Sequence, residues 1–65
     1  MPVIRIEMYE GRSTDQKRAC AKAVTEAWVA TCGGTAQSVQ IIFTDVSQSD
    51  WAAGGRLASD PKPAG

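Results

Sequence analysis

The chain has 65 residues, with seven basic and seven acidic side chains and no histidine, so we expect one small domain without the basic patch of a nucleic-acid binder. No apolar run approaches the ~20 residues of a membrane helix and no signal peptide is evident, which favours a cytoplasmic protein. Such a domain is marginal alone. Cys20 and Cys32 fall about 18 Å apart on a predicted helix, which is too far for a disulfide. No histidine is available for a metal site, and no cofactor is expected. We therefore expect the domain to be stabilised by self-association.

Pro2 directly follows Met1, and methionine ahead of a small residue is usually trimmed during synthesis. Trimming would leave the Pro2 nitrogen as a free secondary amine, and α-amino groups titrate at roughly 7.7–8.0. A general base works best with a pKa near the working pH, so this amine is a candidate base in a chain without histidine. The alternative is an ordinary proline, which is common at this position. A retained Met1 would make the nitrogen an amide without a basic lone pair.

The first predicted element is a strand over Val3–Tyr9, because apolar side chains recur there with period two. Glu10-Gly11-Arg12 ends the strand. Ser13 and Gln16 then fit a capping box that opens a helix.

This helix is predicted to run to about Cys32, where Gly33-Gly34 supplies a C-cap. Its apolar stripe is thin and contains one large residue, Trp28, which is more readily explained by packing than by ligand binding. The stripe comprises Cys20, Val24, Ala27, Trp28 and Thr31.

A second strand is predicted over Ser38–Val46. Its centre is apolar on both faces except at Gln40, which is typical of parallel sheets, and about thirty residues between strand centres allow a right-handed crossover. The predicted fold is α+β, a single β-α-β unit. One helix covers only one face of two strands, so we expect large apolar residues on the other face and obligate self-association through it.

The remaining chain is predicted to be a turn over Ser47–Asp50 and a short hairpin over Trp51–Leu57, with Gly54-Gly55 at its bend. Residues 60–65 are expected to form a loose tail of the single domain 1–65.

Arg12 is the second candidate for chemistry. Helix N-termini attract anions, and the planar guanidinium of an arginine suits carboxylates, so this residue is a candidate for carboxylate capture. The alternatives are a solvated arginine or an ion pair with Glu7 or Glu10.

Tyr9 and Trp51 are candidate apolar walls, and a wall beside an amine lowers its pKa by desolvating the charged form. Without other information, ordinary packing at a subunit contact is the favoured explanation of both residues. Arg56 is either a second cation or, more simply, a surface charge.

Taken together, these features resemble the 4-oxalocrotonate tautomerase (2-hydroxymuconate tautomerase) family of the tautomerase superfamily. The resemblance rests on Met1-Pro2 before a strand, Glu10-Gly11-Arg12-Ser13 with Gln16-Lys17, Ser38-Val39, and Gly54-Gly55, and it extends to about Ser59.

The resemblance implies short β-α-β chains that pair into dimers with a four-stranded sheet and then into hexamers (trimers of dimers). It implies that Pro2 is the general base that moves a proton between carbon atoms of a small unsaturated 2-hydroxy or 2-oxo carboxylate. It also implies that Arg12 binds a substrate carboxylate, that Trp51 shapes the pocket, and that neighbouring subunits share each site.

One position departs from the family pattern. Where tautomerases that act on dicarboxylate dienols carry a second arginine, this chain has Gln40, which donates a hydrogen bond without charge. Losing such a donor commonly costs ~10²–10³ in rate, so we expect either a substrate with one carboxylate or another cation, Arg56 or Arg5, in its place. Ala53 indicates a roomier pocket than in relatives with a larger aliphatic residue.

Three functions follow as hypotheses. The first is a proline-based tautomerase. The second, from the same superfamily, is a hydratase or dehalogenase of unsaturated acids that uses a protonated proline, against which Gln40 also argues. The third is a self-assembling β-α-β module without turnover, which a retained Met1 would favour.

Overall fold

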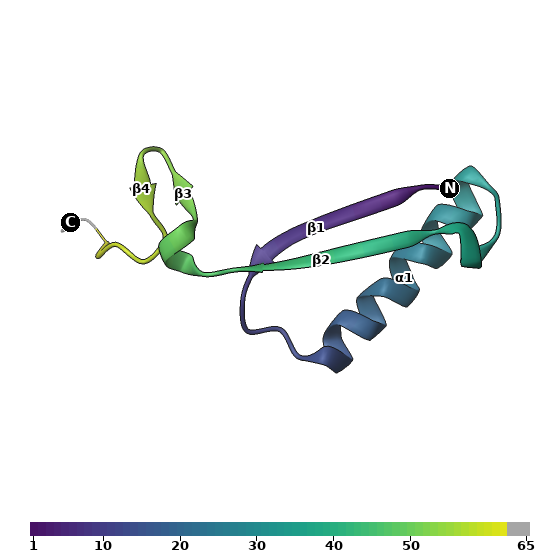
Figure 1. The fold of residues 1–65 in the computed structure, drawn as a ribbon, viewed down its shortest axis with the longest axis horizontal. Helices are drawn as coiled ribbons and strands as arrows, with labels where there is room; N and C mark the ends of the chain where they lie inside the picture. The colour runs from purple at the N-terminus through teal and green to yellow at the C-terminus, as the bar shows by residue number, and fades with distance from the viewer. Residues whose placement is uncertain (63–65) are drawn as a thin grey trace.

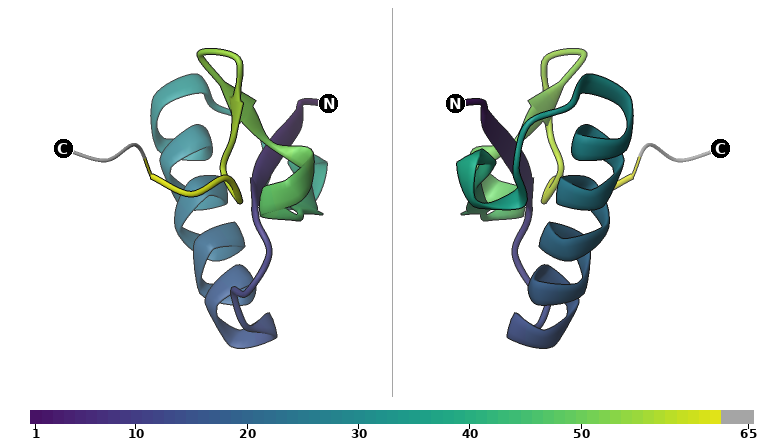
Figure 2. Two further views of the ribbon diagram at one scale, coloured as in Figure 1. Left: turned by 90° about the vertical axis from the view of Figure 1, so that its left-hand side faces the viewer. Right: turned by 90° about the vertical axis from the view of Figure 1, so that its right-hand side faces the viewer.

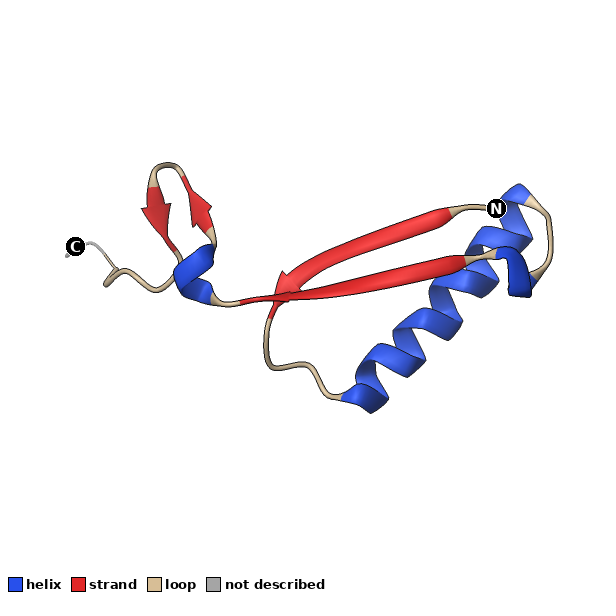
Figure 3. Cartoon of the chain, viewed as in Figure 1, coloured by secondary structure: helices blue, strands red, loops and turns tan. Residues whose placement is uncertain are grey.

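The computed structural model describes residues 1–62 as a β-α-β unit followed by a small hairpin (Figure 1), which confirms the α+β prediction. Figure 3 shows the same order of strands and helices. The elements are β1 (Val3–Tyr9), α1 (Thr14–Cys32), β2 (Gln40–Val46), β3 (Ala52–Ala53) and β4 (Arg56–Leu57), with 3₁₀ turns at Ala36–Ser38 and Gln48–Asp50.

Strands β1 and β2 pair in parallel, with Val3 opposite Gln40 and Tyr9 opposite Val46. The predicted parallel crossover through the helix is therefore confirmed. The second strand begins two residues later than predicted, because Ser38 belongs to a 3₁₀ turn. Its amide and hydroxyl both donate to the carbonyl of Thr35, at 3.1 and 2.8 Å, which keeps this segment out of the sheet.

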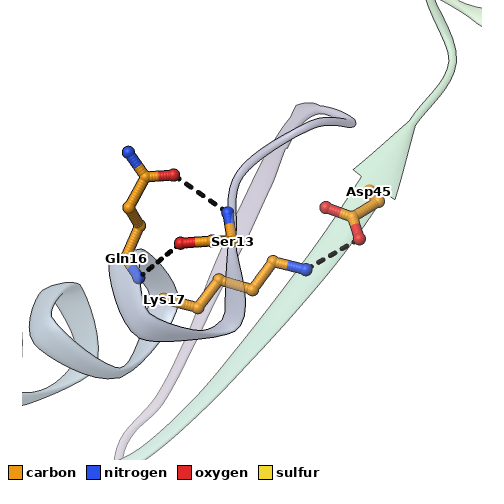
Figure 4. A network of polar contacts seen from close by, with 4 residues as sticks. All are labelled: Ser13, Gln16, Lys17 and Asp45. Carbon is orange, nitrogen blue, oxygen red and sulfur yellow. Dashed lines mark hydrogen bonds and ion pairs between the residues drawn. The ribbon is translucent and has the colours of Figure 1, made fainter.

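The start of α1 has the predicted capping box (Figure 4). The Ser13 hydroxyl accepts from the Gln16 amide at 3.1 Å, and the Ser13 amide donates to the Gln16 side chain at 2.9 Å. Two amides that the first helical turn leaves unpaired are thereby satisfied. At the other end Gly33, with φ of 83°, donates to the carbonyl of Val29 at 3.0 Å, so the helix ends where the glycine pair predicts.

The face of α1 that packs on the sheet differs in part from the predicted stripe. Ala27 and Thr31 are exposed, and the Thr31 hydroxyl donates back to the Ala27 carbonyl at 2.7 Å. Trp28 lies on the packed face, and successive helical residues are about 100° apart, so Ala27 points off that face. The half-buried helix residues are Lys17, Cys20, Ala21, Val24, Thr25, Trp28 and Val29.

An ion pair that the sequence did not predict joins the first turns of α1 to the end of β2. The Nζ of Lys17 lies 2.7 Å from the Oδ2 of Asp45 (Figure 4). The Lys17 side chain is 27% exposed and that of Asp45 44%, so the pair contributes only about 0–1 kcal/mol of stability. The pair joins the start of α1 to the end of β2.

The two faces of the β1–β2 sheet differ in cover, because α1 lies on one of them (Figure 2). The helix-facing residues are Ile4, Ile6, Met8, Ile41 and Phe43, all half-buried. The open face exposes Val3, Tyr9 and Ile42 by 48%, 43% and 44%, which confirms that both strands present apolar residues there. The open face also carries more polar residues than predicted, namely Arg5, Glu7, Gln40 and Thr44.

Residues 47–62 form an arm that extends away from the β-α-β unit (Figure 1). Strands β3 and β4 pair antiparallel around Gly54 and Gly55, whose φ angles of 62° and 81° fit a type I′ turn, so the predicted hairpin is confirmed in position. The Asp60 carboxylate accepts from the Leu57 amide at 3.0 Å. Asp60 is therefore fixed to the arm, whereas residues 63–65 of the expected tail lie outside the described residues.

The single chain is open and elongated. Among residues 1–62 no side chain is buried. The chain exposes 5059 Å², whereas a compact monomer of this size exposes about 4,000 Å². The radius of gyration is 15.8 Å, against about 11 Å for a compact domain of this length. No helix in the described part is long and apolar enough to cross a membrane.

Replacing Ser13 with alanine removes the hydroxyl that caps α1, and we expect this to lower the free energy of unfolding by about 1 kcal/mol. Urea denaturation at one fixed protein concentration measures the change. Ser59→Ala is the matched control, because the Ser59 hydroxyl makes no hydrogen bond among residues 1–62. Equal midpoints for the two variants would show that the cap contributes nothing.

Candidate active site

The N-terminal end of the sheet places Pro2 beside Gln40. The Pro2 carbonyl accepts from the Gln40 amide at 3.0 Å, which continues the β1–β2 ladder by one step. The side-chain nitrogen Nε2 of Gln40 lies 3.3 Å from the sulfur of Met1. The side chain of Gln40 thus lies next to Met1, whose removal would free the Pro2 nitrogen.

Arg12 lies beyond the opposite end of β1, in the turn that leads into α1. Gly11, with φ of 120°, lets the chain reverse there, and the Ser13 cap fixes the next residue. Arg12 is exposed, and its side chain makes no ion pair or hydrogen bond among residues 1–62. The alternative pairing with Glu7 or Glu10 is therefore absent, and the guanidinium is available for a ligand.

Arg12 also borders a hollow of about 160 Å³ between α1 and the helix-facing side of the sheet. Its wall is largely apolar, and it is lined by Ile6, Met8, Arg12, Gln16, Lys17, Cys20 and Phe43. A cavity of about 150 Å³ is large enough for a ring the size of benzene. The hollow places apolar surface beside Arg12, whose side chain remains exposed to solvent.

Tyr9 and Trp51 meet at this same end of the sheet. Their ring centroids are 4.8 Å apart with an interplanar angle of 66°, an edge-to-face contact of a kind that contributes about 0.5–1.5 kcal/mol beyond area burial. The contact joins the end of β1 to the start of the arm. The two residues predicted as apolar walls therefore form one aromatic pair.

The predicted site residues consequently form two separate groups. Pro2 and Gln40 occupy one end of the sheet, whereas Tyr9, Trp51 and Arg12 occupy the other. At ~3.3 Å per residue, Pro2 and Tyr9 are about 23 Å apart along β1. This separation is too large for groups at both ends of the sheet to contact one small molecule within a single chain.

The two cations considered as substitutes for an arginine at position 40 lie elsewhere. Arg5 is on the open face, opposite Ile42 in the parallel register. Arg56 is in the arm, where its guanidinium donates to the Pro61 carbonyl at 2.7 Å. Ala53, which pairs with Arg56, is also in the arm and exposed.

Two features of this region escaped the sequence reasoning. The hollow was not expected, because helix and strand patterns do not show where two packed surfaces fail to meet. The role of Lys17 as partner of Asp45 was also missed, since 28 residues separate them. Their opposite charges, near the start of the helix and the end of a parallel strand, were the available signal.

Comparison with known proteins identifies the group to which this chain is related. Residues 2–60 match the protein family described as Tautomerase enzyme. A probable tautomerase of Ralstonia nicotianae is 39% identical over 57 residues, which is 88% of either chain. A probable tautomerase of Streptococcus pneumoniae serotype 4 has the same identity over 88% of this chain and 95% of its own.

Solved structures agree with the sequence relatives. The fold is similar to that of YwhB, a homologue of 4-oxalocrotonate tautomerase, with a TM-score of 0.88 and 30% identity over 94% of this chain and 100% of the other. It is also similar to a 4-oxalocrotonate tautomerase isozyme of Methylibium petroleiphilum, with a TM-score of 0.81 and 35% identity over 88% and 92% of the two chains. The chain is thus a member of the tautomerase family, of the 4-oxalocrotonate tautomerase type.

Proposed function

We propose that this protein is an isomerase that interconverts keto and enol forms of a small unsaturated 2-hydroxy or 2-oxo carboxylate, with Pro2 as general base. Family membership supports the reaction class. The observation that carries the assignment is the position of Pro2, which directly precedes β1 and lies beside Gln40. The side-chain amide of Gln40 has no partner other than Met1 among residues 1–62. The chemistry requires removal of Met1, because only then does the Pro2 nitrogen have a basic lone pair.

The proposed reaction is a proton transfer between two atoms of the substrate. The Pro2 nitrogen takes the proton of the enol hydroxyl, the electrons shift along the conjugated system, and the protonated nitrogen returns the proton to a carbon. The product is the keto form, and neither an oxidant nor a metal enters the balance. Gln40 donates a hydrogen bond to the oxygen on which negative charge develops, as preorganised donors do in such sites.

Arg12 binds the substrate carboxylate in this proposal, because its guanidinium is exposed and unpaired within residues 1–62 and borders an apolar hollow. The Tyr9–Trp51 pair forms a wall of the same pocket. An apolar wall disfavours the charged form of a nearby amine, which keeps more of the base unprotonated at neutral pH.

Assembly completes the site in this proposal. A second copy related by a two-fold axis runs its strands antiparallel to the first, so the start of β1 in one copy lies near the end of β1 in its partner. The pair forms a four-stranded sheet and brings Pro2 and Gln40 of one chain to Arg12, Tyr9 and Trp51 of another. We further propose a hexamer of three such dimers in the cytoplasm, in which the open sheet face with Val3 and Ile42 becomes buried.

A hydratase or dehalogenase reaction is less well supported. It requires a protonated proline flanked by two arginines, and this site offers Arg12 together with an uncharged Gln40. If Met1 stays attached, we expect a self-assembling module without turnover. The Pro2→Ala experiment below, with its measurement of intact mass, distinguishes both alternatives from the proposed tautomerase.

Pro2→Ala is expected to lower kcat for ketonisation of a 2-hydroxydienoate by about 10²–10⁴-fold, because general-base catalysis contributes that much. Both proteins must first be shown by intact mass to lack Met1. For the unaltered protein, kcat/KM should rise with pH as the Pro2 amine loses its proton. Undiminished turnover in Pro2→Ala would refute the assignment, and hydration in place of ketonisation would favour the second reaction.

Arg12→Ala is expected to raise KM by about 10- to 100-fold, because it removes a charge-assisted hydrogen bond to the carboxylate. Arg12→Lys keeps the charge without the bidentate geometry, so its KM should lie between those of the unaltered protein and Arg12→Ala. Arg18→Ala is the control, since Arg18 pairs with Asp15 on the exposed helix surface. Equal KM values for Arg12→Ala and Arg18→Ala would exclude carboxylate binding by Arg12.

Mixing two impaired variants tests whether neighbouring chains share the site. Pro2→Ala and Arg12→Ala chains, dissociated together, reassembled and assayed with substrate well below the KM of Arg12→Ala, should regain about a quarter of the original activity, because a random quarter of shared sites receives both intact residues. The reassembled single variants are the controls. No recovery in a mixture proven by mass to contain hetero-oligomers would place both residues of each site in one chain.

A further inference from the structure

Resting on the proposed function, we infer that Lys17 and Asp45 are positioning residues, whose ion pair holds Arg12 where it binds the substrate carboxylate. Arg12 is exposed, and its side chain makes no ion pair or hydrogen bond among residues 1–62. Its place beside the hollow therefore depends on how the turn that carries it is attached to the rest of the chain. Lys17 and Asp45 do not touch the substrate in this role.

The turn that carries Arg12 is attached to the end of β2 on both sides. Before Arg12, the Glu10 amide donates to the Val46 carbonyl at 3.0 Å. After it, the Nζ of Lys17 reaches across from α1 to the Oδ2 of Asp45 at 2.7 Å (Figure 4). Two consecutive residues of one strand therefore hold the turn, one through the backbone and the other through a side-chain ion pair.

The first helical turn connects Lys17 to Arg12. The Lys17 amide donates to the Ser13 carbonyl at 3.0 Å, and Ser13 directly follows Arg12 and caps α1. Lys17 and Arg12 line the same hollow, together with Met8, which is opposite Asp45 in the strand register. The ion pair thus joins helix to sheet at the end of the hollow where Arg12 lies, and a change in this contact reaches Arg12 through one turn of helix.

A second ion pair on α1 provides a comparison. Arg18 pairs with Asp15 within the first turns of the helix, and both side chains are much more exposed than those of Lys17 and Asp45. The Arg18–Asp15 pair attaches α1 to no other element. The Lys17–Asp45 pair, in contrast, joins residues that are 28 positions apart in the chain, so it is the one of these two that can fix the turn against the sheet.

Positioning and simple charge predict opposite effects for one substitution. Asp45→Asn removes a negative charge from the neighbourhood of the bound carboxylate, which by Coulomb's law alone should tighten binding. If the ion pair positions Arg12, the same substitution frees the turn, and binding must then order it again. Groups that are already ordered bind more tightly because they avoid this cost, so positioning predicts weaker binding.

The affinity of a saturated 2-oxo acid tests the inference apart from turnover. We would measure the dissociation constant of 2-oxohexanoate by NMR, on protein proven by intact mass to lack Met1. Asp45→Asn and Lys17→Met are each expected to raise it about 3- to 10-fold, the cost of ordering a freed segment. The double variant should match either single one, because each removes the same contact. Asp45→Glu and Lys17→Arg keep the charges and should restore binding, and Asp15→Asn is the matched control.

Turnover adds a measurement that a loss of stability would not reproduce. The same two variants should raise KM and leave kcat unchanged, because Pro2 is untouched, whereas weaker folding or association would lower kcat. Tighter or unchanged binding in Asp45→Asn would overturn the inference, and weaker binding in Lys17→Met alone would assign direct carboxylate binding to Lys17. Normal affinity in Arg12→Ala would refute both the inference and the proposed site. Expected affinities without turnover would refute only the proposed reaction.

Discussion

One helix lies against two strands in this chain, and the second face of the sheet has no cover. The single chain therefore leaves apolar surface of both strands exposed. The 19 residues of α1 half-bury one row of strand side chains, and no residue among 1–62 is buried completely. Val3, Tyr9 and Ile42 remain on the open face with more than two-fifths of their surface exposed. Hydrophobic burial is the dominant favourable term in folding, so the proposed contacts with other copies would supply the burial that the single chain lacks.

The same architecture separates the chemical groups. A seven-residue strand places Pro2 and Gln40 at one end and the Tyr9–Trp51 pair at the other. In the proposed assembly, pairing of two chains brings the base to the carboxylate-binding group, and the association of three such pairs buries the open apolar face. A variant that weakens the pairing of two chains is then expected to lower activity.

The interactions that hold the second group of residues in place are individually weak. The capping box fixes the chain one residue after Arg12, and the Lys17–Asp45 pair fixes α1 against the end of β2. The aromatic pair holds the arm at the same end. Each contributes roughly 1.5 kcal/mol at most, yet together they define where Arg12, the apolar hollow and the rings of Tyr9 and Trp51 lie relative to one another.

Local rules were enough to obtain the strand over Val3–Tyr9, the helix from its Ser13 cap to Gly33 and the hairpin bend at Gly54-Gly55, because alternation, capping and left-handed glycine act within a few residues. They also singled out Pro2 and Arg12 as unusual for their positions. The packed face of the helix, the late start of β2, the Lys17–Asp45 pair and the hollow beside Arg12 depended on tertiary contacts between residues far apart in the chain. Only the structure showed that Trp51 packs on Tyr9 while Gln40 lies beside Pro2, so that the candidate site residues divide between the two ends of the sheet, because no pattern within a few residues encodes either contact.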